Sequence, residues 1–119
     1  MTKLVSAIVI SGPLKGHKYI VKSDSKILIG RGDEANIRIG YDDYCSRKHA
    51  LLYWEGNACF IEDLNSTNGT FINANRITGK VELHNGDLVG LGGTELAIKI
   101  EDAPKGEQSS SGDDITYED

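Results

Sequence analysis

The sequence predicts an all-β fold, a two-sheet β-sandwich, over residues 1–100 of this 119-residue chain. Short apolar or alternating runs are separated by turn signals at nearly every break, a pattern typical of such sandwiches. No window of helical length spaces its apolar residues three and four apart. The fourteen glycines match the many loops of this fold, which gathers them at its ends, where side chains from distant strands converge.

Four strands are expected before residue 41. Apolar and β-branched residues fill 4–10, and 17–21 form the return strand after a turn that contains glycine and proline. Residues 27–29 are fully apolar and stop at Gly30-Arg31, which predicts a short buried strand that ends in a loop. Residues 37–39 alternate between apolar and polar side chains, as a strand with one buried face does.

Six further strands are expected up to residue 100. A loop with a central glycine joins 49–54 to 58–63, which predicts a β-hairpin. Residues 95–100 alternate, with their larger apolar side chains on one face. The remaining short strands are expected at 70–72, 81–83 and 88–91.

The negative charge of the chain lies at its C-terminal end. Residues 101–119 carry seven acidic residues and one lysine, whereas residues 1–100 carry twelve basic and eleven acidic residues, so the net charge of −5 comes from the tail. Low hydrophobicity, a serine run and scattered acids predict a disordered acidic tail or linker at 101–119. Without a concentrated basic face, nucleic-acid binding is not expected.

The composition also limits the cellular compartment that we expect and the cofactors that the protein could bind. The two cysteines have no metal-ligand spacing, and no signal peptide is recognisable at the N-terminus. No apolar run approaches the ~20 residues that a membrane-spanning helix needs. We therefore expect a cytoplasmic protein that does not insert into a membrane and binds no metal or cofactor.

Three polar stretches follow or precede the expected strands, and the first two contain arginine. Arg31 ends a buried strand, and its fixed planar charge matches the geometry of a phosphate or carboxylate. Taken alone, a surface arginine in a turn explains this residue equally well. The third stretch, 65–70, holds five hydrogen-bonding side chains and a glycine, and alone it would be an ordinary asparagine-glycine turn.

The second stretch, Ser46-Arg47-Lys48-His49, also invites a hydrolase interpretation. Ser46 would be the nucleophile and His49 its base. However, Ser46 does not lie on a strand-to-helix elbow with flanking glycines, and no acid is placed to orient the imidazole. We therefore expect His49 to be a structural hydrogen-bonding residue and the protein not to be an enzyme.

Taken in order, four stretches resemble the forkhead-associated (FHA) domain family. They are Gly30-Arg31, Ser46-Arg47-Lys48-His49, Asn65-Ser66-Thr67-Asn68-Gly69-Thr70 and Asn85-Gly86-Asp87. Their order and spacing, with a strand between each pair, match that family's pattern over about residues 4–100. The resemblance implies a β-sandwich whose loops at one end bind a phosphothreonine-containing protein or peptide of a serine/threonine kinase pathway, without catalysis.

The resemblance assigns roles to single positions. Arg31 resembles the phosphate-binding arginine, and Ser46 resembles the hydroxyl that donates to the phosphate. Arg47 resembles the neighbouring position that reaches phosphate or peptide, Thr67 resembles another phosphate contact, and Asn68 resembles the residue that holds the peptide backbone. The positions that shape the loops are Gly30, His49 and Gly69.

The chemistry of a phosphothreonine fits these residues, because it brings a charge of about −1.5 to −2 and three strong acceptor oxygens. Selection of the flanking peptide side chains is expected from 41–45, 64–66 and 74–76. Within the tail, Thr116 has an acid three residues later and is a candidate phosphorylated ligand of the chain's own site or of the site of a neighbouring copy. The alternative function is a phosphate-independent interaction module that uses the sheet surface.

Overall fold

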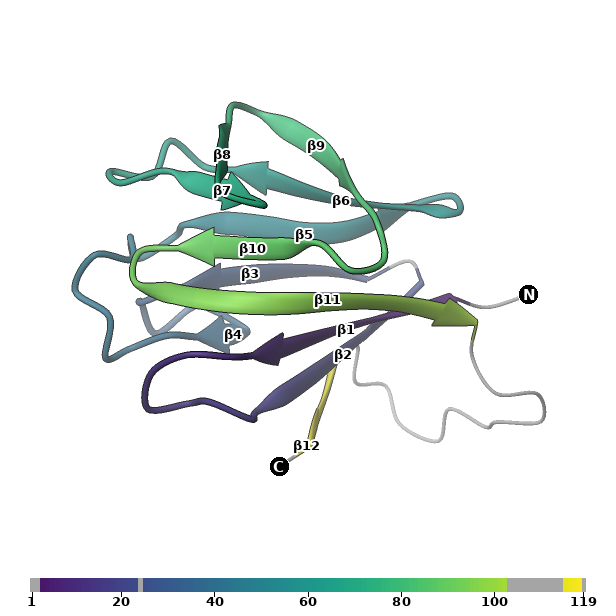
Figure 1. Ribbon diagram of the computed structural model, residues 1–119, viewed down its shortest axis with the longest axis horizontal. Coiled ribbons are helices and arrows are strands. Elements are labelled where there is room, and N and C mark those ends of the chain that lie inside the picture. The colour runs from purple at the N-terminus through teal and green to yellow at the C-terminus, as the bar shows by residue number, and fades with distance from the viewer. Residues whose placement is uncertain (1–2, 24, 103–114, 119) are drawn as a thin grey trace.

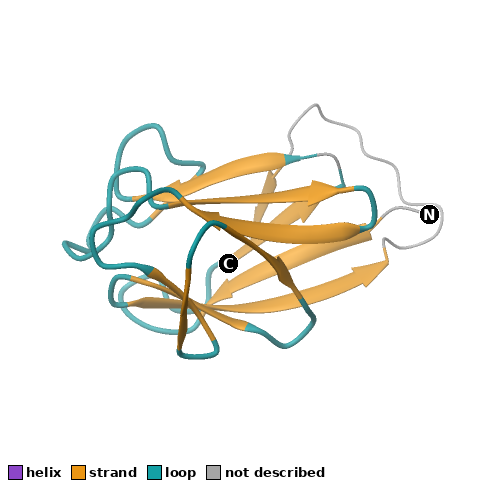
Figure 2. Cartoon of the chain, turned by 90° about the horizontal axis from the view of Figure 1, so that it is seen from above, coloured by secondary structure: helices purple, strands orange, loops and turns teal. Residues whose placement is uncertain are grey.

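The computed structural model describes residues 3–23, 25–102 and 115–118, and these residues form two β-sheets that face each other (Figures 1 and 2). The described part of the chain contains no helix, so it also contains none able to cross a membrane. The predicted all-β sandwich is confirmed. Most of the segment predicted to be a disordered tail lies outside the described residues.

The first sheet has seven strands, and all of its neighbouring pairs are antiparallel. In spatial order they are β12 (Ile115–Glu118), β2 (Lys18–Lys22), β1 (Lys3–Val9), β11 (Thr94–Asp102), β10 (Leu88–Leu91), β7 (Thr70–Ile72) and β8 (Asn75–Ile77). The second sheet has five strands: β4 (Ile37–Arg38), β3 (Lys26–Gly30), β5 (Ala50–Glu55), β6 (Ala58–Asp63) and β9 (Lys80–Leu83).

Alternating side chains from both sheets form one core between them. Along β1, Val5, Ala7 and Val9 are buried, and along β5 the inward positions include Leu52 and Trp54. The Trp54 indole donates a hydrogen bond of 3.2 Å to the Val21 carbonyl, which joins the two sheets through a polar contact inside the core. The core side chains come from alternate positions of these strands, as the pleat of a β-strand requires, although Ser6 and Tyr53 between them are also buried.

The strands carry the loops of interest to one end of the sandwich. Figure 1 shows that the connections β4–β5, β6–β7 and β10–β11 all lie at the end of the molecule where β3 also stops. Strand β3 pairs in parallel with β4 and antiparallel with β5, so the β3–β4 loop lies beside the chain that leads into β5. The three polar stretches of the sequence therefore meet at one place.

Two strands were not predicted from the sequence. Strand β8 is short and mostly exposed, with only Ile77 buried, and it closes one edge of the first sheet. Strand β12 forms the opposite edge, where it pairs with β2. In addition, β11 continues to Asp102, two residues beyond the expected end of the domain at residue 100.

Candidate functional site

Gly30 lets the end of β3 lie against the loop that precedes β5. A Cβ atom at this position would lie 2.0 Å from the Arg47 carbonyl oxygen, so a residue with a side chain does not fit. The close approach allows two backbone hydrogen bonds, from the Arg31 N–H to the Ser46 carbonyl (2.9 Å) and from the Gly32 N–H to the Arg47 carbonyl (3.2 Å). The arginine loop and the serine loop are thus held together by backbone contacts.

His49 is fully buried and braces two loops at once. Its Nδ1 accepts a hydrogen bond from the Ser46 N–H (3.0 Å), and its Nε2 lies 2.9 Å from the Gly69 carbonyl oxygen. Because Nδ1 accepts, the neutral tautomer with the proton on Nε2 satisfies both contacts. Both ring nitrogens are therefore used by backbone groups, and neither touches the Ser46 hydroxyl as a general base would.

Asp63, at the end of β6, holds the 65–70 loop from inside. Its carboxylate accepts hydrogen bonds from the Ser66 and Thr70 hydroxyls and from the Ser66 N–H. The Ser66 hydroxyl oxygen in turn accepts from the Gly69 N–H at 3.0 Å. Burial alone would raise the pKa of Asp63, but these hydrogen bonds outweigh it, and the pKa lies below its ordinary value.

Sequence reasoning did not single out Asp63, although a signal was present. An aspartate three residues before a serine in a polar, glycine-bearing loop is placed to accept local hydrogen bonds from that loop. Asp42 was missed as well; it is buried and accepts from the Tyr44 N–H, the Gly93 N–H and the Thr94 hydroxyl, and the last two donors lie 51 and 52 residues away along the chain, so no local pattern indicates them. These two carboxylates fix the loops on either side of the predicted binding residues.

The serine loop and the 65–70 loop also touch each other directly. The Thr67 N–H donates to the Ser46 hydroxyl oxygen at 3.0 Å, and the Asn68 side-chain amide donates to the Tyr44 carbonyl at 2.8 Å. Because the Ser46 oxygen already accepts one hydrogen bond, its own O–H remains able to donate to an incoming anion. Thr67 and Asn68 are exposed at the surface.

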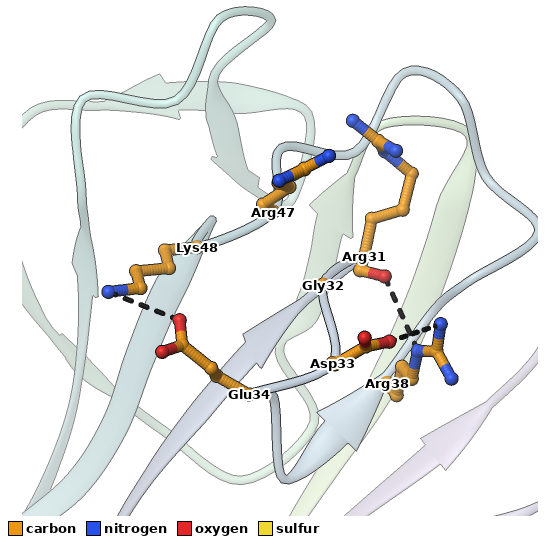
Figure 3. Close-up of a pocket in the computed structure, with 7 residues that line it drawn as sticks. All are labelled: Arg31, Gly32, Asp33, Glu34, Arg38, Arg47 and Lys48. Carbon is orange, nitrogen blue, oxygen red and sulfur yellow. Dashed lines mark hydrogen bonds and ion pairs between the residues drawn. The ribbon is translucent and has the colours of Figure 1, made fainter.

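A cavity of about 740 Å³ opens between the β3–β4 loop and the start of β5. Its lining contains four cations and two acids, together with a glycine: Arg31, Gly32, Asp33, Glu34, Arg38, Arg47 and Lys48. Figure 3 shows the head groups of Arg31 and Arg47 extending toward the same side, away from the two acids.

The four cations of this cavity are not equivalent. Arg38 pairs with Asp33 at 2.8 Å and Lys48 pairs with Glu34 at 3.2 Å (Figure 3). Within the described residues, Arg31 has no acidic partner; its Nε donates instead to the Cys45 carbonyl at 3.0 Å. That hydrogen bond directs the Arg31 side chain while leaving most of its guanidinium donors for another acceptor.

The structure therefore brings the five predicted binding residues to one end of the sandwich. They come from three neighbouring loops, which are tied together by the Ser46 carbonyl and hydroxyl groups, since these accept from the Arg31 and Thr67 N–H groups. The 74–76 segment lies beside the 65–70 loop, because a Cβ on Gly69 would approach Arg76 Nε to 2.7 Å. The described residues contain no group of three or more His, Cys, Asp or Glu side chains positioned for a metal ion.

This geometry agrees with the comparison with protein families, in which the FHA domain model matches residues 27–92, more than half of the chain. The chain belongs to the FHA domain family. FhaB of Mycobacterium tuberculosis is 36% identical over 92 residues, which cover 77% of this chain and 58% of FhaB. This FHA chain thus spans little more than half the length of that relative.

Solved structures superpose on this chain with the same fold. The FhaA FHA domain, solved in complex with the intracellular domain of Rv3910, gives a TM-score of 0.70 at 32% identity and covers 80% of this chain and 99% of that domain. Mycobacterium tuberculosis EmbR, solved in complex with a low-affinity phosphopeptide, gives a TM-score of 0.75 at 26% identity. The EmbR match covers 87% of this chain and 26% of EmbR.

Proposed function

We propose that this FHA domain is a signalling or adaptor module that binds phosphothreonine peptides through the loops around Arg31, Ser46 and Thr67. The observation that carries this proposal is the pair of arginines, Arg31 and Arg47, that line one cavity and have no acidic partner among the described residues. A dianionic group is the ligand that such a pair fits best.

The donors around the cavity are sufficient for one phosphate. Arg31 offers a planar fork, Arg47 a second guanidinium, and Ser46 and Thr67 offer hydroxyl groups. Asn68 is assigned to the backbone of the bound peptide, and its amide is already held by the Tyr44 carbonyl. We expect a peptide side chain close to the phosphothreonine to contact Tyr44, because its side chain is exposed and its carbonyl holds the Asn68 amide.

The partner, in this proposal, is a protein phosphorylated by a serine/threonine kinase. The complex of EmbR with a phosphopeptide supports a phosphorylated ligand, and the complex of FhaA with the Rv3910 intracellular domain supports a protein partner. We further propose that residues 1–100 are the binding domain and 101–119 an acidic tail, and that the protein acts in the cytoplasm without catalytic activity. Phosphorylated Thr116 remains a candidate ligand from the tail.

The test is a calorimetric titration with one peptide in its phosphothreonine and unphosphorylated forms. The phosphorylated form should bind and the unphosphorylated form should not. Arg31→Ala should weaken binding at least about 100-fold, because charge-assisted hydrogen bonds contribute about 1.5–3 kcal/mol each and the guanidinium can make two. Amide NMR spectra should show that the fold of this variant is intact.

Lys48→Ala is the matched control, because Lys48 lines the same cavity but already pairs with Glu34. It removes the same formal charge and should change the affinity by no more than about threefold, the effect of an exposed ion pair. Equal losses for Arg31→Ala and Lys48→Ala would show that only the overall charge matters. Equal binding of the unphosphorylated peptide would instead favour the phosphate-independent sheet-surface module.

A further inference from the structure

The segment Ile115–Glu118 lies far from the binding loops in sequence and forms the edge strand β12 of the first sheet (Figure 1). It pairs antiparallel with β2, with Thr116 opposite Ile20 and Glu118 opposite Lys18. Without β12, strand β2 would be the edge of the sheet. An open edge presents unpaired N–H and C=O groups, and these are a template for another extended segment.

The pairing of β2 with β1 determines which backbone groups of β2 face β12. The Val9 N–H donates to the His17 carbonyl at 2.9 Å, and Ala7 lies opposite Tyr19 in the same ladder. Because the direction of backbone groups alternates along an antiparallel strand, the N–H groups of Tyr19 and Val21 point toward β1. Those of Ile20 and its alternate neighbours point toward β12.

This alternation fixes the role of each residue in β12. The N–H and C=O of Thr116 face those of Ile20, whereas the N–H of Tyr117 faces away from the sheet. In this register the sequence places the acidic residue Glu118 at the position opposite Lys18, and Lys22 follows the other end of the paired segment. A cross-strand pair of opposite charges favours this register.

We propose that the β2 edge is a second binding site of the domain, for a short acidic extended strand, and that the chain's own Ile115–Glu118 is its occupant. The site uses backbone hydrogen bonds of β2 and the charge of Lys18, and none of the residues around the Arg31 cavity. The existence of this second site therefore does not depend on whether the loops bind phosphothreonine. One consequence concerns the tail: while β12 is paired, Thr116 is held in the ladder and has to leave β2 before it can reach the loops.

Amide hydrogen exchange of the full chain tests this assignment. The Ile20 amide should be protected, and its protection should depend on β12, whereas the Tyr19 and Val21 amides face β1 and serve as internal references. Thr116→Pro removes the N–H that faces β2 and should accelerate Ile20 exchange about tenfold relative to Thr116→Ala. Tyr117→Pro removes a solvent-facing N–H and should match Tyr117→Ala.

A charge exchange tests the acidic preference of the site. Glu118→Lys should accelerate Ile20 exchange by about two- to fivefold, and adding Lys18→Glu to that variant should restore it. Rapid Ile20 exchange in the parent chain, or equal effects of Thr116→Pro and Tyr117→Pro, would overturn the assignment. Protection that rises with protein concentration would also overturn it, because the occupant would then come from a second copy of the chain.

A titration separates this site from the proposed function. Thr116→Pro should leave the affinity for an added phosphothreonine peptide within about twofold of that of Thr116→Ala, because the β2 edge shares no residue with the Arg31 cavity. A failure of the phosphopeptide to bind would contradict the proposed function and leave the exchange result unchanged. A large affinity change in Thr116→Pro would show that the two sites are not independent.

Discussion

Replacing Gly30 with alanine tests the contact on which the whole site depends. The new Cβ would lie 2.0 Å from the Arg47 carbonyl oxygen, whereas real Cβ atoms essentially never come within 3.0 Å of such an atom, so the two loops must separate by at least about 1 Å. Overpacking of this kind costs about 1–3 kcal/mol. The separation also weakens the bonds from Arg31 and Gly32 to the serine loop, at about 1 kcal/mol each.

The expected total is about 3–5 kcal/mol of unfolding free energy, which corresponds to a decrease in melting temperature of at least about 12 °C for a domain of this size. Urea denaturation of the parent and of Gly30→Ala measures this difference in unfolding free energy. Gly90→Ala is the matched control, because its Cβ would meet only Phe71 Cβ, at an ordinary contact distance of 3.5 Å. If Gly30→Ala unfolded within about 0.5 kcal/mol of Gly90→Ala, the close packing of these loops would be refuted.

Two further predictions concern titratable groups. Burial raises the pKa of Cys45 to about 11 and that of Cys59 to about 12. Neither thiol should therefore react with Ellman's reagent at neutral pH until the protein is unfolded. Fast labelling of the native protein would contradict the burial of these two thiols. Asp63 has a pKa below its ordinary 3.8, so the stability it contributes is complete above that pH and is lost as the pH falls through its folded value. Urea denaturation between pH 2 and 7 should therefore show Asp63→Asn least different from the parent at the acidic end.

The strands that could be predicted are those whose pattern is local. Strands β6, β7 and β10 begin and end at the expected residues, because apolar alternation and flanking turns are both visible in their own sequence. Strand β8 escaped prediction because two of its three residues, Asn75 and Arg76, are polar and exposed. Strand β12 escaped prediction because its acidic surroundings resemble a linker, and only the distant edge of β2 gives it a partner.

The residues of the site could be predicted by type, but their contacts could not. A motif such as Ser46-Arg47-Lys48-His49 indicates anion chemistry, yet no local pattern shows that His49 contacts Gly69, twenty residues away. Pairings of this kind depend on how the strands are ordered in the sheets. The carboxylate of Asp42 was missed for the same reason, because its donors Gly93 and Thr94 are distant in the sequence. Asp63 differs, because its donors Ser66 and Thr70 are local and the sequence did carry a signal for them.

The polar residues of the site fall into two groups, those that fix the loops and those that would contact the proposed phosphate ligand. His49 and Asp63 use their hydrogen bonds inside the protein, and this fixes the loops before any ligand arrives. A fixed site loses less conformational entropy on binding than a flexible one, at roughly 0.5–1.5 kcal/mol for each side chain that need not be ordered. Arg31 is directed by the Cys45 carbonyl and Ser46 by the Thr67 N–H, so both groups that would meet the phosphate are already positioned. In the proposed function, Asp63 and the buried Asp42 would therefore strengthen anion binding indirectly, because they hold the loops in place without pairing with either arginine.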